Sequence, residues 1–481
     1  MSTEHFDVLI VGAGISGIGA AHHLGERCPG RTYAILEGRD RIGGTWDLFR
    51  YPGIRSDSDM HTLGFRFKPW EAKRAIADGD AILDYLDETA REGHIDEHIR
   101  FGHHVDRASW SSEDARWTVE ATKKDGEAVQ LSCNFLFMCS GYYDYAEGHA
   151  PRFEGQESFE GPIVHPQHWP KDLDYAGKKV VVIGSGATAV TLVPAMAETA
   201  AHVTMLQRTP TYIAALPWED AIANALKERL SPETAYAITR WKNILMSQLI
   251  YTVSKKAPDR MRRFLEKGVR EHLGDDYPIE KHFRPPYGPW DQRLCLAPDG
   301  DFFVSIREGK ASVVTDHIDR FTTHGIRLKS GEELEADIIV SATGLKLQFL
   351  GGVDVHIDGE PLVAHEHMSY KAMMVSDVPN LAFSVGYTNA SWTLKADLTS
   401  EYVCRLLNHM EARGYRTCTP RRDPSVDEAP FLDFSSGYVK RALHYLPKQG
   451  QKAPWKVKQN YFFDMFYLRH GKLDDGVMRF A

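Results

Sequence analysis

Two glycine-rich loops in this chain have the spacing of a cradle for the phosphates of a dinucleotide. The loop at 12–17 follows a buried aliphatic run, and the loop at 184–189 follows a second such run. The first glycine permits a tight turn, the second lets a pyrophosphate approach the backbone, and a third small residue lets the following helix pack on the strand. The phosphates then lie at a helix N-terminus, where backbone N–H groups attract anions. The residues with these roles are Gly12, Gly14 and Gly17 in one loop and Gly184, Gly186 and Ala189 in the other.

The residue at the end of the next strand differs between the two loops. The run after the first loop ends in Glu37, 25 residues beyond Gly12, whereas the run after the second ends in Arg208, 24 residues beyond Gly184. A carboxylate accepts hydrogen bonds from ribose hydroxyls and repels a 2′-phosphate, whereas a guanidinium pairs with that phosphate. The second loop therefore predicts NADP, and the first a nucleotide with a free ribose. Because two pyridine nucleotides would serve no purpose together, the predicted cofactors are FAD and NADPH.

These cradles require two sheets, each with helices on its faces. The predicted fold class is α/β, with two Rossmann-like dinucleotide-binding domains, for FAD and for NADP. The stretches 135–143 and 336–344 are predicted as buried strands, and we expect both to join the first sheet, which makes the NADP domain an insertion in the FAD domain. The predicted domains are 1–145, the first part of the FAD-binding domain; 146–335, the linker and NADP-binding domain with a helical insert at about 211–276; and 336–481, the second part of the FAD-binding domain and the C-terminal region.

The helical insert carries an apolar stripe. Ser231 is its predicted N-cap, and Ile238, Trp241, Leu245 and Leu249 follow at three- and four-residue spacing. Residues at this spacing share one face of a helix. We expect the stripe to belong to the core, in an insert that covers a cleft.

The composition restricts the classes of function. A chain of 481 residues exceeds one core, because single cores stop growing at roughly 250–300 residues. With a formal net charge of −9 it has no general attraction to nucleic acid, so no such partner is predicted. The six cysteines lack a CxxC pair, which argues against a disulfide framework and fits a reducing cytoplasm. No metal site is predicted, because the histidine pairs His103/His104 and His165/His168 lack a third ligand at a recognisable spacing.

Two segments bear on contacts with other surfaces. No run approaches the ~18 apolar residues of a membrane span, and no secretory signal is recognised. The stretch 254–273 is basic and partly amphipathic, which is compatible with peripheral membrane contact and with an ordinary solvated helix face. The stretch 455–473 is compatible with packing on the core and with self-association. The predicted location is the cytoplasm, with membrane association and oligomerisation both open.

The linker between the cradles carries a specific motif. Residues 159–170 contain Phe159-x-Gly161-x-x-x-His165-x-x-x-Trp169-Pro170, which resembles the fingerprint of type I Baeyer–Villiger monooxygenases. The resemblance extends over essentially the whole chain, with the cradles flanking the fingerprint in the family's order. The related flavin monooxygenases that oxidise heteroatoms normally lack the Trp-Pro ending. The segments similar to the ethionamide-activating subgroup are GGTWDLFRYPGIRSDSDM at 43–60, PWDQRLC at 289–295 and YTNASWTLKADL at 387–398.

This resemblance implies an FAD- and NADPH-dependent monooxygenase that inserts one oxygen atom of O2 next to a ketone carbonyl. The product is an ester or lactone, formed via a peroxyflavin, and the same oxidant acts on sulfides and on thiocarbonyl compounds such as thioamides and thioureas. The implied partners are O2 and a small-molecule ketone or sulfur-containing substrate. Two alternatives stay open: a flavin monooxygenase acting mainly on S or N heteroatoms, and a flavin-bound regulatory protein without turnover.

The resemblance also implies roles for single residues. An anionic oxidant needs a fixed cation, which is Arg293, and Asp57 matches the carboxylate that orients it; the alternative for Arg293 is a loop arginine bound to carbonyl groups. His165 is a candidate hinge residue or a histidine that caps a loop. Gln292 stands where many members have lysine, so Arg208 must provide more of the NADPH selectivity. The implied FAD contacts are Gly12, Gly14, Ser16, Gly17, Glu37, Gly44, Thr45, Trp46, Asp57 and Val105, and the implied NADP contacts are Arg55, Gly184, Ser185, Gly186, Ala187, Thr188, Ala189, Val190, Arg208 and Thr209.

Overall fold

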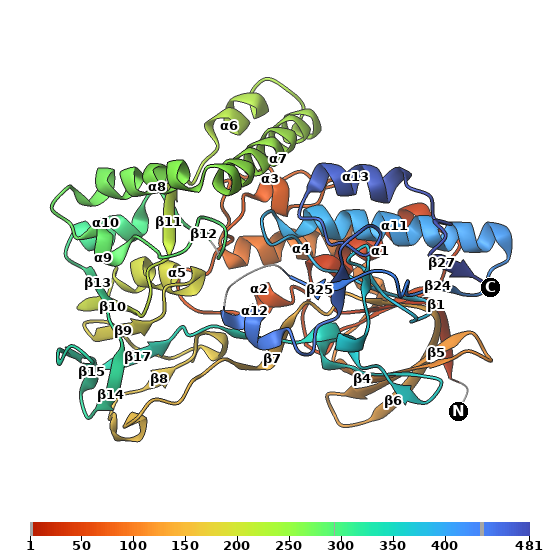
Figure 1. Ribbon diagram of the computed structural model, residues 1–481, viewed down its shortest axis with the longest axis horizontal. Helices are drawn as coiled ribbons and strands as arrows, with labels where there is room; N and C mark the ends of the chain where they lie inside the picture. Colours follow the sequence, from red (N-terminus) through yellow and green to blue (C-terminus); the bar gives the residue numbers. More distant parts are fainter. Residues whose placement is uncertain (1–2, 293, 433–436) are drawn as a thin grey trace.

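Two separate sheets lie toward opposite ends of the molecule's long axis, with helices packed along them (Figure 1). The computed structural model describes residues 3–292, 294–432 and 437–481. The first sheet is built from both ends of the chain and the second from its middle. The fold is therefore α/β with two Rossmann-like units, one inserted in the other, as the sequence predicts.

The first sheet combines a parallel core with an antiparallel flank. Strands β3, β2, β1, β6 and β23 run parallel, so the loops that follow them lie at one edge of the sheet. The long strand β6 pairs with β5 through its first half and with β23 through its second. In spatial order the strands are β20 (Glu360–Pro361), β19 (Asp354–Ile357), β4 (His103–Ser111), β5 (Arg116–Lys123), β6 (Ala128–Met138), β1 (Glu4–Val11), β2 (Tyr33–Leu36) and β3 (Ile99–Arg100), and β23 (Leu381–Phe383) pairs with β6.

The second sheet is entirely parallel, and it overturns one prediction. The strand at 338–341, expected in the first sheet, pairs with β9 and β8 of the second. Its aliphatic run fits either sheet, because core strands of parallel sheets are buried on both faces. The first sheet is completed instead by β23. In spatial order the strands of the second sheet are β13 (Ala311–Thr315), β10 (His202–Gln207), β9 (Lys179–Ile183), β17 (Ile338–Ser341) and β8 (Ile163–Val164).

An antiparallel ribbon of two strands joins the sheets. β7 (Tyr143–Gly148) leads from the first sheet toward the second, and β18 (Leu345–Leu347) returns beside it. In Figure 1, β7 lies between the two lobes. The chain thus leaves the first unit along β7 and returns to it along the adjacent strand β18. The limits of the predicted domains at 145 and 335 stay predictions.

Helices cover the faces of both sheets. α1 and α11 pack on each other over the first sheet, and α5 and α10 pack together at the second. The helices are α1 (Ile15–Arg27), α2 (Thr45–Leu48), α3 (Met60–Leu63), α4 (Gly79–Glu92), α5 (Ala187–Met196), α6 (Ala221–Lys227), α7 (Pro232–Lys256), α8 (Pro258–Leu273), α9 (Ile279–His282), α10 (Asp301–Arg307), α11 (Trp392–Arg413), α12 (Gly437–Ala442) and α13 (Tyr461–His470).

The remaining short strands pair as β11 (Tyr212–Leu216) with β12 (Leu294–Pro298), β14 (Ile318–Thr322) with β15 (Gly325–Leu328) and β15 with β16 (Glu333–Glu335), β21 (Ser369–Tyr370) with β22 (Met374–Val375), β24 (Cys418–Pro420) with β27 (Met478–Phe480), and β25 (Glu428–Pro430) with β26 (Lys448–Gly450).

The predicted core stripe of the helical insert faces outward instead. α7 begins at the predicted N-cap Ser231, whose hydroxyl accepts a hydrogen bond from the Thr234 N–H. The prediction that the stripe is buried is wrong, because α7 packs through its other face, which carries Tyr236, Arg240 and Ile244. The stripe residues are 42% to 57% exposed, namely Ile238, Trp241, Leu245 and Leu249.

The C-terminal stretch packs on the first unit. Trp455 is 1% exposed, and α13 lies along α11. Lys395 of α11 and Asp464 of α13 form a buried ion pair at 2.8 Å. Of the two alternatives for 455–473, packing on the core is therefore observed. In the described part of the chain, no helix is both long and apolar enough to cross a membrane.

Candidate active site

The first glycine loop lies at the carboxyl edge of the first sheet, between β1 and α1. Gly12 has φ +102°, and a Cβ there would lie 2.7 Å from the carbonyl oxygen of Cys139, which follows β6. A Cβ on Gly17 would lie 1.9 Å from the Gly12 oxygen, so α1 packs directly on the loop. Gly14 is the N-cap of α1, and no side chain caps this end. The N–H groups of the first turn are thus available to an anion.

Glu37 lies at the end of β2, beside the same loop. Its Oε2 accepts a hydrogen bond from the Ala13 N–H at 2.8 Å, and its Oε1 accepts one from the Arg39 N–H at 2.9 Å. Burial raises the pKa of Glu37, while the two N–H groups act in the opposite direction. A carboxylate offers about four acceptor positions, so ribose hydroxyls can bind beside these N–H groups. Val105 is buried in β4, whose first residue donates its N–H to the Glu37 carbonyl at 2.9 Å.

The predicted FAD contacts at 44–46 lie against the first loop. Gly44 has φ +56°, and a Cβ there would lie 3.2 Å from the Cα of Gly14. The Thr45 hydroxyl lies 3.4 Å from the Tyr145 hydroxyl of β7. Burial raises the pKa of Tyr145 to about 12, so this phenol stays neutral at physiological pH. Trp46 is half-buried against the core of the first unit. Gly44, Thr45 and Trp46 therefore all lie at this cradle, as predicted.

Trp392 ties the C-terminal half of the chain to the first cradle. Its Nε1–H donates a hydrogen bond to the Ser16 hydroxyl at 2.7 Å. The ring of Tyr142 stacks on it with centroids 5.0 Å apart and planes inclined by 12°. Trp392 lies in the segment 387–398 that resembles the subgroup, but neither this residue nor Tyr142 is a predicted site residue. Their contact joins the loop after β6 to the start of α11, about 250 residues away, and no local periodicity predicts such a contact.

The second glycine loop has the same strand, turn and helix but more open space. Gly184 has φ +130°, and a Cβ there would lie 2.3 Å from the carbonyl oxygen of Ala342, after β17. Gly186 is the N-cap of α5, without a side-chain cap. A Cβ on Gly186 would meet no atom within 4 Å. The predicted contacts 187–190 form the first turn of α5, so their N–H groups face this open space.

Arg208 follows β10 at the carboxyl edge of the second sheet. Its side chain is exposed and donates no hydrogen bond to any described residue. The Ser185 hydroxyl donates to the carbonyl of Thr209 at 3.1 Å, which holds the loop against the end of β10. The predicted NADP contacts of this cradle are therefore gathered at one edge, with the guanidinium free to meet a phosphate.

The segment 51–59 runs between the two cradles. A Cβ on Gly53 would lie 2.6 Å from the Cβ of Ala195 in α5, so the segment packs on the second unit. Arg55 is 7% exposed in its side chain and pairs with Asp301 of α10, with Nη1 to Oδ2 at 2.5 Å and Nη2 to Oδ1 at 3.3 Å. Asp57 is half-buried two residues later. The segment thus joins the units, and the predicted contact of Arg55 with NADP stays a prediction.

The predicted catalytic arginine, Arg293, lies outside the described residues. The loop before it is held by α7, because Lys255 Nζ lies 2.7 Å from Asp291 Oδ1. The same helix reaches the Asp57 segment, because Asn243 Nδ2 donates to Asp59 Oδ1 at 2.8 Å. One helix therefore contacts both segments that carry the predicted catalytic pair.

The fingerprint residues lie at the joint between the units. His165 follows β8, and its Nε2–H donates to the Gly344 carbonyl at 3.2 Å while Nδ1 accepts from the Gln167 N–H at 3.2 Å. These partners assign the neutral tautomer with the proton on Nε2. Burial lowers the pKa of His165. A Cβ on Gly148, at the end of β7, would lie 2.1 Å from the imidazole Cε1, so the ring fills the joint of the ribbon.

The other fingerprint residues pack the linker on the second unit. Phe159 is buried beside Phe321, and a Cβ on Gly161 would lie 2.2 Å from the Asp337 carbonyl oxygen. The ring of Trp169, which precedes Pro170, packs edge-on against Tyr175, with centroids 6.5 Å apart and planes inclined by 78°. The fingerprint is thus a linker packed on the second unit, while the hinge role of His165 stays a prediction.

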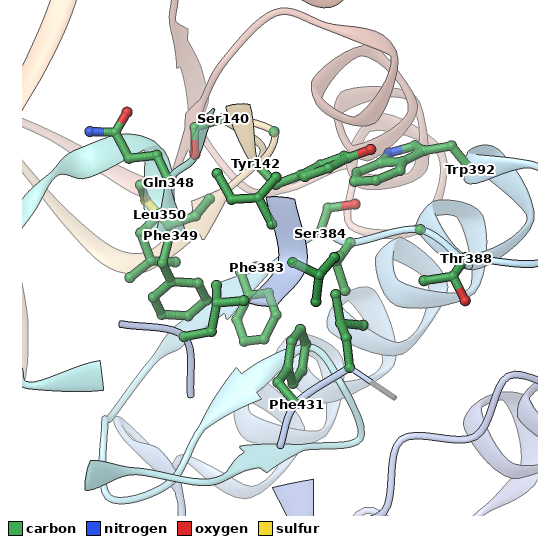
Figure 2. A pocket seen from close by; sticks show the side chains of 18 of the residues that line it. Ser140, Tyr142, Gln348, Phe349, Leu350, Phe383, Ser384, Thr388, Trp392 and Phe431 are labelled. Carbon is green, nitrogen blue, oxygen red and sulfur yellow. The ribbon is translucent and has the colours of Figure 1, made fainter. Parts of the chain in front are cut away.

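An apolar pocket opens beside the first cradle (Figure 2). Its walls come from the ends of β6, β18 and β23 with the loops after them, from the start of α11, and from α12 and the segments beside it. Trp392 and Tyr142 form the wall that touches Ser16. None of the described lining residues is charged, so the pocket suits an uncharged, apolar molecule. The lining is Met138, Ser140, Gly141, Tyr142, Leu347, Gln348, Phe349, Leu350, Phe383, Ser384, Val385, Gly386, Tyr387, Thr388, Trp392, Phe431, Leu432, Val439 and Leu446.

Solved structures share this two-unit fold. Cyclohexanone monooxygenase bound to epsilon-caprolactone superposes with a TM-score of 0.76 at 20% identity, covering 100% of both chains. A steroid monooxygenase bound to NADP superposes with a TM-score of 0.72 at 24% identity, covering 87% of this chain and 88% of that one. At such identities the likeness establishes the fold, and it agrees with the fingerprint's resemblance to Baeyer–Villiger monooxygenases.

Sequence relatives establish the family. A family model described as pyridine nucleotide-disulphide oxidoreductase matches residues 9–256. The FAD-containing monooxygenase EthA of Mycobacterium tuberculosis is 58% identical over 481 residues, which are 100% of this chain and 98% of that protein. A probable FAD-binding monooxygenase, AlmA, of an Acinetobacter species is 52% identical over 480 residues, 99% of this chain and 96% of that protein. The chain therefore belongs to the FAD-containing monooxygenases, in the group with the Baeyer–Villiger monooxygenase fold that includes EthA and AlmA.

Proposed function

We propose that this protein is an FAD- and NADPH-dependent Baeyer–Villiger monooxygenase, which converts apolar ketones into esters or lactones and also oxygenates sulfides and thiocarbonyl compounds. The observation that carries the proposal is the uncharged pocket attached to the first cradle through Trp392 and Ser16. A monooxygenase must hold its organic substrate against the flavin and away from water. Trp392 lines the pocket and contacts Ser16 of the cradle, so a substrate in the pocket would lie next to the bound flavin nucleotide.

The residues of the first cradle fit FAD. The uncapped first turn of α1 can bind the pyrophosphate, and Glu37 can accept hydrogen bonds from the adenosine ribose. Gly44, Thr45 and Trp46 line the same loop and would contact the nucleotide beyond the phosphates. FAD, when bound and reduced by NADPH, would activate O2, of which one atom enters the substrate and the other leaves as water.

The residues of the second cradle fit NADPH. The open space at Gly186 leaves room for a pyrophosphate at the N-terminus of α5. Arg208 is exposed and can pair with the 2′-phosphate. Arg55 already pairs with Asp301, so a contact with NADP would have to share its remaining donors.

Asp57 and Arg293 are the proposed catalytic pair. Arg293 provides a permanent positive charge for the oxygen anion that develops during reaction, and Asp57 orients the guanidinium. The position of Asp57 between the cradles supports this assignment, since both nucleotides must approach each other there. The role of Arg293 itself follows from its motif, PWDQRLC.

The test is product formation with NADPH and a series of ketones of increasing chain length. We expect esters by mass spectrometry, with NADPH consumption matched to product. Arg293→Ala should bind flavin and be reduced by NADPH normally, yet form no ester, whereas the neighbouring Gln292→Ala should keep ester formation. Ester formation by Arg293→Ala at the wild-type rate would remove Arg293 from the mechanism.

A monooxygenase acting mainly on sulfur or nitrogen remains the alternative, because an uncharged pocket admits a thioether as well as a ketone. Competition between a thioether and a ketone of equal size separates the two activities. A large advantage in kcat/KM for sulfur would favour the alternative. Absence of any substrate-dependent O2 consumption would instead indicate a flavin-bound protein without turnover.

A further inference from the structure

Helix α7 presents an apolar face to the outside of the molecule. The stripe described above is joined by Met246, which is 52% exposed, and by Phe264 of α8 and Phe466 of α13, each 69% exposed. The ring of Trp241 stacks near Phe462 of α13, with centroids 6.2 Å apart and planes inclined by 20°. In Figure 1, α7, α8 and α13 lie along the same side of the molecule. We call this set the apolar helical face: Ile238, Trp241, Leu245, Met246, Leu249, Phe264 and Phe466.

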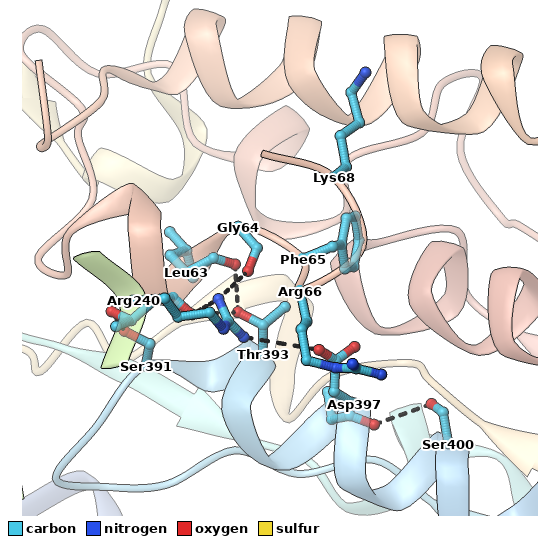
Figure 3. A network of polar contacts seen from close by, with 12 residues as sticks. Leu63, Gly64, Phe65, Arg66, Lys68, Arg240, Ser391, Thr393, Asp397 and Ser400 are labelled. Carbon is cyan, nitrogen blue, oxygen red and sulfur yellow. Dashed lines mark hydrogen bonds and ion pairs between the residues drawn. The ribbon is translucent and has the colours of Figure 1, made fainter. Parts of the chain in front are cut away.

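The orientation of α7 is fixed by buried polar contacts on its opposite side (Figure 3). Arg240 Nη1 donates to the carbonyls of His61 at 2.7 Å and Gly64 at 2.8 Å, and Arg240 Nη2 lies 3.7 Å from Asp397 Oδ2 of α11. The Tyr236 hydroxyl donates to the Phe65 carbonyl at 2.8 Å. Rotating α7 to bury its stripe would leave Asp397 without this partner and would bring Arg240 into solvent. The exposed stripe is therefore a fixed feature of the fold.

Positive charge gathers next to this face. Between residues 232 and 273 there are nine Lys or Arg and four Asp or Glu. Four of these cations pair with carboxylates outside the segment, namely Arg240, Lys242, Lys255 and Arg270. Lys256, Arg260 and Arg263 are exposed and form no ion pair with any described residue. Arg260 and Arg263 precede Phe264 by four residues and one, so basic side chains flank the most exposed ring of α8. We call these three residues the basic rim.

We propose that the apolar helical face and the basic rim dock this protein peripherally on an anionic phospholipid bilayer. Exposed Leu, Ile, Trp and Phe side chains bury into the boundary between headgroups and acyl chains, and Lys and Arg beside them meet the lipid phosphates. A second copy of this chain is a poorer occupant, because a symmetric pairing brings the two basic rims together.

The docked helix also contacts the active site. α7 holds Asp59, next to the Asp57 segment, and Asp291, in the loop before Arg293. Apolar ketones partition into bilayers, so docking would bring the enzyme to its substrate; this advantage, unlike the docking itself, rests on the proposed function. Membrane binding can thus be tested without any measurement of turnover.

The experiment is co-sedimentation of the flavin-loaded full chain with vesicles. We expect binding to vesicles of about one-third phosphatidylglycerol in phosphatidylcholine, and much weaker binding to phosphatidylcholine alone or at high salt. Leu245→Ser with Leu249→Ser, and separately Arg260→Glu with Arg263→Glu, should each weaken binding by roughly tenfold or more. Trp241→Phe should lose a vesicle-induced blue shift of tryptophan fluorescence.

Matched controls use exposed residues on other surfaces. Val363→Ser removes an apolar side chain that is 37% exposed, and Lys329→Glu with Arg413→Glu reverses two exposed charges. These controls should bind vesicles as the wild type does. The proposal is overturned if the wild type does not sediment with anionic vesicles, or if the two face variants bind as well as the controls. It is also overturned if Leu245→Ser with Leu249→Ser converts a dimer to a monomer without lipid, since a second copy would then cover the face.

Discussion

The two nucleotide cradles have the same backbone plan but differ in how far they are preformed. In the first cradle Glu37 is buried and holds the N–H groups of Ala13 and Arg39, while Gly14 packs near Gly44. In the second, Arg208 is exposed without a hydrogen-bond partner among the described residues, and Gly186 faces open space. A site whose recognition groups are built into the core suits a nucleotide that stays bound. A site whose cation is exposed to solvent suits a nucleotide that binds and dissociates in each catalytic cycle.

The largest expected effect is the difference in flavin binding between a substitution at Gly12 and one at Gly186. Gly12→Ala forces a side chain into φ +102° and brings Cβ to 2.7 Å from the Cys139 oxygen, which costs roughly 3 kcal/mol or more. We expect the affinity for FAD to fall by about 100-fold, or the protein not to fold, measured by titration with FAD and by the flavin absorbance of the purified protein. Gly186→Ala meets no protein atom within 4 Å, so it should fold with full flavin and only raise the KM for NADPH. Equal loss of flavin in both variants would contradict the contrast between the cradles.

The second effect concerns Arg208. Arg208→Ala removes a charge-assisted hydrogen bond to the 2′-phosphate, worth about 1.5–3 kcal/mol. The KM for NADPH should therefore rise roughly 10- to 100-fold, while the KM for NADH changes little. Because Arg208 is exposed and unpartnered among the described residues, flavin content and thermal stability should not change. Steady-state kinetics with both nucleotides checks this, and an equal rise for NADH would rule out a phosphate contact.

The smallest expected effect is a pH dependence at the joint between the units. Burial holds the pKa of His165 in the folded protein below its ordinary value of 6.5, which applies to the unfolded chain. At a pH between these two pKa values, the unfolded chain therefore binds more protons than the folded protein. Its contribution to stability is present above pH 6.5 and is lost as the pH falls through the folded pKa. His165→Asn should therefore show a slightly smaller fall in Tm on acidification than the wild type. The exposed His324→Asn is the control, and identical pH profiles for His165→Asn and the wild type would refute the prediction.

Local sequence predicted those parts of the site that one strand, one turn and one helix create. The positive φ of Gly12 and Gly184 and the uncapped starts of α1 and α5 follow from the glycine spacing alone. Pairing between distant segments could not be predicted in this way. The strand 338–341 joins the second sheet rather than the first, and β23 takes the expected place, because an aliphatic run does not specify which parallel neighbour it pairs with.

The sequence by itself determined the two cradles, the opposite charges of Glu37 and Arg208, and the fingerprint between them, because each depends on residue types at short spacing. The tertiary structure alone decided that Trp392 and Tyr142 meet beside Ser16 to wall an apolar pocket. It also decided that α7 turns its apolar stripe outward. Periodicity shows that a helix has two faces, but the carbonyl groups and Asp397 that surround Arg240 come from segments far away in the chain, and they determine which face is buried.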